Sequence, residues 1–309
     1  MKIWYPEGTR RSMSDIKVTI LNEELVRDMA PARPASGHKG TFGTALITAG
    51  SEYMPGACVL ACGAALRSGC GLVRVFSEKR TLDAVGVTHP CALQSLRDGM
   101  PTAVLRTAGR LIESADSVLI GPGMPADDLN IRPLLELFIR KNVNLVIDAG
   151  ALSAAAHDKE HILPMLRHRE TPAVLTPHPG EFARISAGVE GISPDDSSET
   201  AAVKLAAKLK SVIVLKNSRT VIAMPDGRLF KNETENDGLA KGGSGDVLAG
   251  LAAGLLAQGA TPEKAACAAV WIHSQAGLAA SAKYGRRAML PSDLEEFLPD
   301  AFTKAGWNS

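Results

Sequence analysis

Short, uniformly apolar segments alternate with longer segments of helical periodicity from about residue 44 onward. Each short segment is rich in valine, isoleucine and leucine and ends beside glycine or another turn-forming residue, which is typical of strands covered on both faces. The predicted strands are 45–50, 72–76, 117–120, 145–147, 173–176 and 212–215, and the predicted helices are 56–68, 131–141, 199–210, 244–258 and 262–283. This alternation predicts an α/β fold with a mostly parallel central sheet flanked by helices on both faces.

Two further elements flank this repeated pattern. Residues 20–29 are expected to form a short helix capped by Asn22. Residues 220–224 and 228–231 are β-prone runs on either side of an Asp-Gly pair at 226–227, which predicts a β-hairpin. The hairpin brings antiparallel character to the sheet near one edge.

The chain shows no internal repeat and no linker long enough to divide it. Residues 1–15 lack periodicity and are expected to be an N-terminal extension, and residues 16–309 are expected to form a single domain. The 34 Lys and Arg residues nearly balance the 33 Asp and Glu residues, and aromatic residues make up only 4% of the chain. Neither feature supports nucleic-acid binding, so a small-molecule ligand is expected.

Cysteine usage and hydropathy indicate the cellular compartment in which the protein is expected. The five cysteines lack CxxC spacing, and although Cys58 and Cys62 are four residues apart on a predicted helix, no histidine joins them as a metal ligand. Reduced, buried thiols are the expected state. The opening residues do not resemble a signal peptide and no apolar run reaches the length of a membrane span, so we expect a cytoplasmic protein with no membrane partner.

Residues that could bind a ligand or take part in catalysis are concentrated where the predicted strands end. Ligands of parallel α/β sheets bind beyond the carboxyl ends of the strands. Five strand-end segments carry such residues: 51–57, 121–123, 148–150, 176–181 and 216–220. One crevice could therefore collect all five.

The most informative segment is the glycine-rich turn from Gly242 to Asp246, which runs straight into an apolar helical pattern. Glycines at a helix start can direct several backbone N–H groups at one anion, which predicts a phosphate site. Asp246 falls in the first helical turn, where a carboxylate beside a phosphoryl donor suits a general base. The alternative is that Ser244 or Asp246 only caps the helix.

Other strand-end residues also leave two interpretations open. His178 lies between two prolines that hold it rigidly at a strand end, either for ligand binding or simply as part of the turn that starts the next helix. Gly121-Pro122-Gly123 either admits a bulky group to the backbone or forms an ordinary tight turn. Asp148 either binds Mg²⁺ or caps the following helix.

The loop from Lys216 to Thr220 could hold a nucleotide base or ribose, or form a solvated hairpin corner. His273, in an alanine-rich helix, is interpreted as a packing residue. The chain contains no P-loop motif, no dinucleotide-binding GxGxxG after the first strand, no GxSxG and no HExxH.

Six segments, taken together, resemble the ADP/ATP-dependent NAD(P)H-hydrate dehydratase family of the ribokinase-like fold. They occur in one order between His38 and about His273, and the combination of the fifth and sixth is specific. The segments are HKGTFGTALITAGS, MPGACVLACGAALRSGCGLV, VLIGPG, VIDAGAL, LTPHPGEFARI and NDGLAKGGSGDVLAG.

The resemblance implies a repair enzyme that removes water from the S epimer of hydrated NADH or NADPH, with Mg²⁺ and ADP or ATP as phosphoryl donor. Bacterial members of the single-domain type generally use ADP, so ADP is the expected donor. The resemblance also implies a homo-oligomer, with a tetramer expected, that acts together with a separate NAD(P)H-hydrate epimerase. A small-molecule kinase of the same superfamily and a non-catalytic ADP or ATP sensor are the alternatives.

Residue roles follow from the same resemblance. It implies that Asp246 is catalytic. It assigns no metal ligands. The implied binding residues for the hydrated dinucleotide are Ala57, Gly123, His178 and Asp246. Those for the adenine nucleotide are Lys216, Asn217, Ser218, Arg219, Thr220 and Gly245, and those for the anion hole are Gly243, Ser244 and Gly245. Asn217 departs from the glycine that the family usually has after the lysine.

Overall fold

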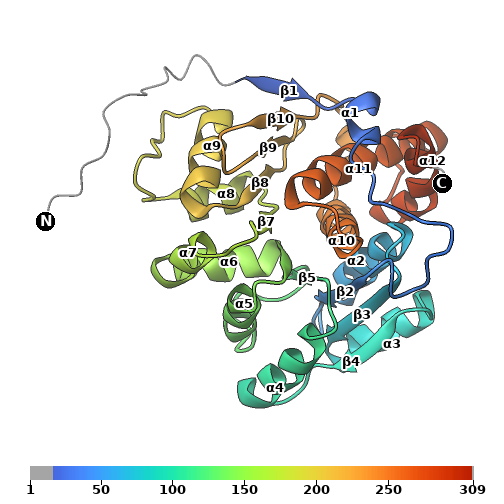
Figure 1. The fold of residues 1–309 in the computed structure, drawn as a ribbon, viewed down its shortest axis with the longest axis vertical. Helices are drawn as coiled ribbons and strands as arrows, with labels where there is room; N and C mark the ends of the chain where they lie inside the picture. The colour runs from blue at the N-terminus through green and yellow to red at the C-terminus, as the bar shows by residue number, and fades with distance from the viewer. Residues whose placement is uncertain (1–16, 308–309) are drawn as a thin grey trace, which may run out of the picture.

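The computed structural model describes residues 17–307, so the extension expected at 1–15 lies outside the described residues. One ten-stranded sheet spans the molecule in the order β1-β10-β9-β8-β7-β6-β5-β2-β3-β4 (Figure 1). The strands are β1 (Val18–Ile20), β2 (Thr44–Thr48), β3 (Leu72–Ser77), β4 (Leu93–Leu96), β5 (Ser117–Ile120), β6 (Asn144–Ile147), β7 (Val174–Leu175), β8 (Val212–Leu215), β9 (Val221–Ala223) and β10 (Leu229–Lys231).

The sheet is mostly parallel, as the sequence predicts. Only β9 runs antiparallel to its neighbours β8 and β10. The predicted hairpin is present: Met224 and Arg228 close it, and Gly227 takes a positive φ of 91° in the turn. β1 pairs with β10 and forms the outer edge, so the hairpin lies one strand inside it.

The helix expected at 20–29 is shorter than predicted. α1 covers Glu23–Arg27, and the Asn22 side chain accepts the Leu25 N–H as the expected cap. Residue 20 belongs instead to β1, because the edge of the sheet offers a partner: the Leu21 N–H donates to the Lys231 carbonyl at 2.9 Å.

Helices cover both faces of the sheet (Figure 1). Because side chains alternate along each strand, Leu119 of β5 packs into one core while Val118 and Ile120 pack into the other. The remaining helices are α2 (Pro55–Arg67), α3 (Lys79–Thr88), α4 (Pro101–Ile112), α5 (Ile131–Arg140), α6 (Ala149–His157), α7 (Lys159–Arg167), α8 (Pro179–Ser186), α9 (Ser198–Leu209), α10 (Ser244–Ala257), α11 (Pro262–Tyr284) and α12 (Leu294–Lys304), with 3₁₀ turns η2 (Asp237–Leu239) and η3 (Pro291–Asp293).

The predicted helices 56–68, 131–141, 199–210, 244–258 and 262–283 are all present, with each end shifted by at most one residue. Strands β1 and β4 and helices α3, α4, α6, α7, α8 and α12 are not among the predicted ranges. β4 escapes the pattern because it is an edge strand, mostly exposed, with only two apolar residues in its four. Within residues 17–307, no helix combines the length and apolarity needed to cross a membrane.

The turns that follow β5 and β6 pack closely against each other, and each contains a glycine at the contact. Gly121 follows β5 with a φ of 121°, and a Cβ there would lie 1.9 Å from the carbonyl oxygen of Asp148. Gly150, in the turn after β6, packs in the same way against the turn after β5, since a Cβ there would lie 1.9 Å from the Met124 carbonyl oxygen. Any side chain at either position would push the corners apart, so the glycines fix where Asp148 lies.

Candidate active site

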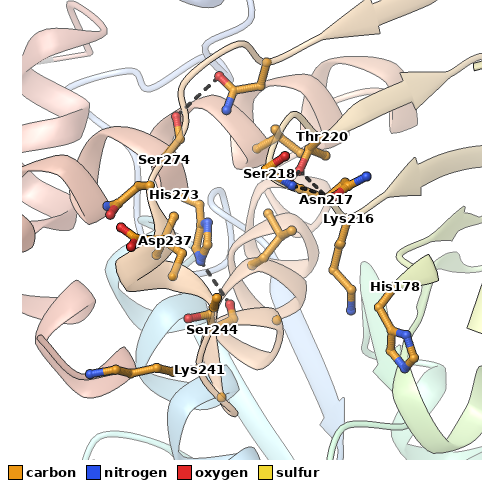
Figure 2. Close-up of a pocket in the computed structure, with 18 of the residues that line it drawn as sticks. His178, Lys216, Asn217, Ser218, Thr220, Asp237, Lys241, Ser244, His273 and Ser274 are labelled. Carbon is orange, nitrogen blue, oxygen red and sulfur yellow. Dashed lines mark hydrogen bonds between the residues drawn. The ribbon is translucent and has the colours of Figure 1, made fainter. Parts of the chain in front are cut away.

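A cavity of about 900 Å³ opens beyond the carboxyl ends of β6, β7 and β8. Asp148, His178 and Lys216 follow these three strands and line the cavity, as do the glycine-rich turn before α10 and part of α11. Figure 2 shows His178 and Lys216 on the side opposite Ser244 and Lys241. Of the five strand-end segments, parts of 148–150, 176–181 and 216–220 meet here. Residues 51–57 and 121–123 do not line this cavity, so a single crevice for all five segments stays a prediction.

The start of α10 forms an open cluster of backbone donors. Gly243 is the N-cap with a φ of 108°, and no side chain caps the helix. The alternative that Ser244 or Asp246 serves as the cap is therefore wrong. Helix geometry leaves the first amides without intrahelical partners. The Ser244 N–H donates to the Lys241 carbonyl at 3.3 Å, whereas among the described residues the N–H groups of Gly243, Gly245 and Asp246 have no acceptor and remain available to an anion in the cavity.

Gly243 and Gly245 are both held in crowded surroundings at this turn. A Cβ on Gly243 would lie 2.6 Å from Cδ1 of Leu60, and a Cβ on Gly245 would lie 3.1 Å from Nζ of Lys216. The Lys216 ammonium thus lies against the helix start, where it adds a full positive charge to the partial charge of the helix dipole.

Lys216 is paired with Asp148. Its Nζ donates to Oδ1 of Asp148 at 2.8 Å, across 68 residues of sequence. Burial alone would lower the pKa of Lys216, but the facing carboxylates of Asp148, Glu181 and Asp246 outweigh burial and raise it. Asp148 occupies the N-cap position of α6, yet its side chain makes no capping hydrogen bond, so the capping interpretation of this carboxylate is wrong.

Asp246 lines the cavity in the first turn of α10 and is half-buried. Burial raises the pKa of its carboxyl to about 7, and the negative charges of Asp148 and Glu181 add to the effect while Lys216 opposes it. Among the described residues, the Asp246 side chain has no hydrogen-bond or ion-pair partner. Such a carboxyl can accept or release a proton near neutral pH.

His178 starts α8 and also faces the cavity. Its Nδ1 accepts the Gly180 N–H at 3.0 Å, while the Glu181 carboxylate accepts the His178 backbone N–H at 2.9 Å, forming a capping box. The neutral ring must then carry its proton on Nε2, which lies 3.5 Å from the other oxygen of Glu181. The two interpretations of His178 are compatible, since it is part of the helix-starting turn and lines the cavity (Figure 2).

The 216–220 loop forms a self-bonded turn at the cavity edge. The Asn217 side chain accepts the Ser218 N–H at 2.8 Å, and the Thr220 hydroxyl donates to the Asn217 carbonyl at 3.2 Å. Asn217, Ser218 and Thr220 line the cavity, whereas Arg219 does not and pairs with Glu235 at 2.8 Å.

Ala57 and Gly123 lie together but outside this cavity. A Cβ on Gly123 would lie 2.7 Å from that of Ala57 and 2.8 Å from the Met54 carbonyl oxygen, and its φ is 65°. The structure therefore separates the predicted dinucleotide-binding residues into this pair, at the start of α2, and the cavity pair of His178 and Asp246.

His273 lies buried behind the glycine-rich turn. Its Nε2 is 3.0 Å from the Ser244 carbonyl oxygen, and burial lowers its pKa to about 4. The ring is therefore neutral and supports the turn from α11, in agreement with its interpretation as a packing residue.

The cavity is also lined by residues that the sequence analysis gave no role, among them Asn236 and Lys241. Asn236 caps η2 by accepting the Gly238 N–H, and Lys241 donates to the Arg287 and Met289 carbonyls. Both belong to the motif around Gly242, so proximity in sequence is the signal that could have identified them.

The described residues do not form a metal site by themselves. Asp148, Glu181 and Asp246 line the cavity, but Asp148 is engaged by Lys216, and no group of three or more His, Cys, Asp or Glu residues between 17 and 307 is placed to hold a metal ion.

Residues 45–300 match a family model described as NAD(P)H-hydrate dehydratase. An ADP-dependent (S)-NAD(P)H-hydrate dehydratase of Bacillus subtilis is 36% identical over 92% of this chain and 98% of its own length. A bifunctional NAD(P)H-hydrate repair enzyme of Moorella thermoacetica is 40% identical over 91% of this chain, which spans only 53% of that relative.

Solved structures agree with the sequence comparisons. A crystal structure of the ADP/ATP-dependent NAD(P)H-hydrate dehydratase of Bacillus subtilis, co-crystallised with ATP/Mg²⁺, has a TM-score of 0.79 and 32% identity, covering 94% of this chain and 99% of that chain. A ribokinase-like superfamily protein of Enterococcus faecalis has a TM-score of 0.81 and 27% identity, covering 99% of each chain. The fold is therefore ribokinase-like.

Proposed function

Because this chain belongs to the NAD(P)H-hydrate dehydratase family, we propose that it dehydrates the S epimer of hydrated NADH or NADPH at the expense of ADP. The products are NAD(P)H, AMP and phosphate. The observation that carries the proposal is Asp246, a carboxyl with a pKa raised to about 7, placed in the helix turn whose amides are open to an anion.

In this reaction Asp246 accepts the proton of the hydroxyl at C6 of the hydrated ring as that oxygen attacks the terminal phosphoryl group of ADP. The hydroxyl becomes a phosphate ester, and AMP leaves. The lone pair of the ring nitrogen expels the phosphate from C6, and loss of a proton from C5 to the departing phosphate or to solvent then restores the C5–C6 double bond. Phosphorylation thus converts a poor leaving group into a good one.

The turn before α10 supplies the electrostatics of the transfer. The N–H groups around Gly243, Ser244 and Gly245 form the proposed anion hole, and the Lys216 ammonium beside Gly245 adds positive charge. Lys216 and the residues to Thr220 form the proposed adenine-nucleotide site. His178, Ala57 and Gly123 are the proposed contacts of the hydrated dinucleotide.

Mg²⁺ is proposed to bind together with the nucleotide and would neutralise the charge of its phosphates. The Bacillus subtilis dehydratase was co-crystallised with ATP/Mg²⁺. We also propose that the substrate is supplied by a separate NAD(P)H-hydrate epimerase, since the bifunctional repair enzymes, of which this chain matches about half, carry further sequence. A homotetramer is the proposed assembly.

The proposal is tested with purified protein, hydrated NADH, Mg²⁺ and either ADP or ATP. Recovery of the absorbance of reduced nicotinamide, with one phosphate released per NADH and faster turnover on ADP than on ATP, is the expected result. Accumulation of a stable phosphorylated product would indicate a small-molecule kinase instead. Nucleotide binding without turnover of any hydrate would indicate a sensor.

A further inference from the structure

Two carboxylates in the cavity face one ammonium group. Lys216 lies against Gly245, the residue immediately before Asp246, and the charges of both Asp148 and Asp246 act on it. Nevertheless, within residues 17–307 its Nζ is within 4.0 Å of a carboxylate oxygen only at Asp148, where the distance is 2.8 Å. Among the described residues, Asp246 is left without an ion-pair partner.

The backbone holds Asp148 in this arrangement at a cost. Ala149 has a φ of 46°, a left-handed conformation that non-glycine residues rarely adopt, and Gly121 and Gly150 leave no room for the corner to relax. Asp148 is 1% exposed and occupies an N-cap position, yet its carboxylate turns away from the helix toward Lys216. Strain at a buried charge indicates a requirement other than helix stability.

The charges facing Asp246 come from every side of the cavity. Asp148, at the start of α6, and Glu181 of α8 are negative, and Lys216 at the end of β8 is positive. The thiol of Cys58 faces it from α2 and stays protonated, because burial raises the pKa of that thiol.

His273 faces the turn from α11 as a neutral ring, and Lys241 is occupied by two backbone carbonyls. Arg286 also lines the cavity, but it pairs with Asp237 at 3.5 Å. Lys216 is therefore the cation whose placement decides whether Asp246 remains a good proton acceptor.

We propose that Asp148 is a positioning residue that binds the Lys216 ammonium and so prevents Lys216 from forming an ion pair with Asp246. An ion pair would stabilise the Asp246 carboxylate and weaken it as a base. With Lys216 held by Asp148, the ammonium still reaches the helix start, while Asp246 keeps its affinity for a proton. The inference rests on the proposed function, in which Asp246 is the base.

Calorimetric titration of the full-length protein with ADP and Mg²⁺ tests it without hydrate turnover. Heats measured in two buffers of different ionisation enthalpy give the protons taken up on binding, and Asp246→Asn identifies the share due to Asp246. Because a bound anion favours the protonated carboxyl, this share is expected in the wild type at and above pH 7.

Two variants are expected to shift the proton uptake in opposite directions, and a third serves as the control. Asp148→Asn is expected to shift the proton uptake to lower pH by about one unit, since Lys216 becomes free to pair with Asp246. Lys216→Met is expected to shift it to higher pH. The matched control is Asp196→Asn, because Asp196 pairs with Lys204 at 2.7 Å away from the cavity, and its uptake curve should match the wild type.

The outcomes separate the two ideas. Normal ADP binding with an unshifted or upward-shifted curve in Asp148→Asn would overturn the positioning role and leave the proposed function intact. The Lys216→Met uptake curve is an independent check should Asp148→Asn fold poorly. A shift of the Lys216→Met curve to lower pH would also overturn the positioning role of Asp148. No binding of ADP to the wild type would overturn the proposed function, and the inference with it.

Discussion

Asp246 combines a helix N-terminus, which favours a carboxylate, with a half-buried site that disfavours one. The second effect is larger, because burial and the charges of Asp148 and Glu181 raise its pKa to about 7. The residue is thus suited to accept a proton at neutral pH, which an ordinary surface aspartate does poorly.

Asp246→Asn should lower kcat by about 10²–10⁴-fold, the usual contribution of a general base, because the amide cannot accept the proton. The variant should still bind ADP, since the amides of the α10 turn are unchanged. Steady-state kinetics and calorimetry measure the two effects. Near-normal turnover would rule out Asp246 as the base.

The pH dependence has a defined sign. A base must be unprotonated in the free enzyme, and the pKa of Asp246 is about 7, so kcat/KM should be high above this pH and fall as pH decreases through it. Measuring kcat/KM between pH 5 and 9 tests for this decrease. A profile that stays flat down to pH 5 would contradict the assignment.

His178 serves two purposes that mutations can separate. His178→Ala should raise the Kd of the hydrated dinucleotide more than that of ADP, because the proposed dinucleotide contact is lost. It also removes the Nδ1 cap of α8, which should lower the free energy of unfolding by about 1 kcal/mol.

His178→Asn is the matched control, since asparagine can cap the helix. It should recover most of the lost stability but not the binding of the hydrate. Equal weakening of both ligands in His178→Ala would indicate that the residue only supports the fold.

At the scale of elements, α10 reaches the site by packing tightly on α2. A Cβ on Gly250 of α10 would lie 2.1 Å from the Ala61 carbonyl oxygen of α2, a backbone atom that cannot move aside easily. The close contact brings the N-terminus of α10 to the cavity and leaves its amides open there.

Gly250→Ala should therefore destabilise the protein by about 1–3 kcal/mol, as overpacked core positions do. Gly109→Ala is the control, because Gly109 lies within α4 and its Cβ would meet nothing within 4 Å. That change should be neutral or stabilise by up to about 1 kcal/mol. Urea unfolding measures both, and equal effects would argue against the packing account.

At the scale of the whole molecule, the sheet has two open edges, β1 and β4. Edge strands offer unpaired backbone groups, and Leu93 and Leu96 of β4 are 38% and 48% exposed. Light scattering should give about four times the mass of the 32.5 kDa chain if the proposed tetramer forms. Leu96→Lys should shift the mass downward if β4 takes part, and a monomeric wild type would contradict the tetramer.

The interior of the sheet was predictable because its strands are buried on both faces. Val118, Leu119 and Ile120 are apolar without alternation, and this pattern is enough to identify β5 from the amino-acid sequence. The edge strand β4 was not predictable, because its residues meet solvent and its pairing depends on β3, which lies in a different part of the sequence.

The sequence by itself determined the mostly parallel α/β architecture and the glycine-rich start of α10 with Asp246 in its first turn. These are local properties, set by apolar periodicity and by the few residues that permit a helix start without a cap. The tertiary structure alone decided that Lys216 meets Asp148 and leaves Asp246 unpaired, and that Ala57 and Gly123 lie together but do not line the cavity of His178 and Asp246. Such contacts join residues far apart in the chain, and they depend on the order of strands in the sheet and on glycine corners that bring strand ends within contact distance.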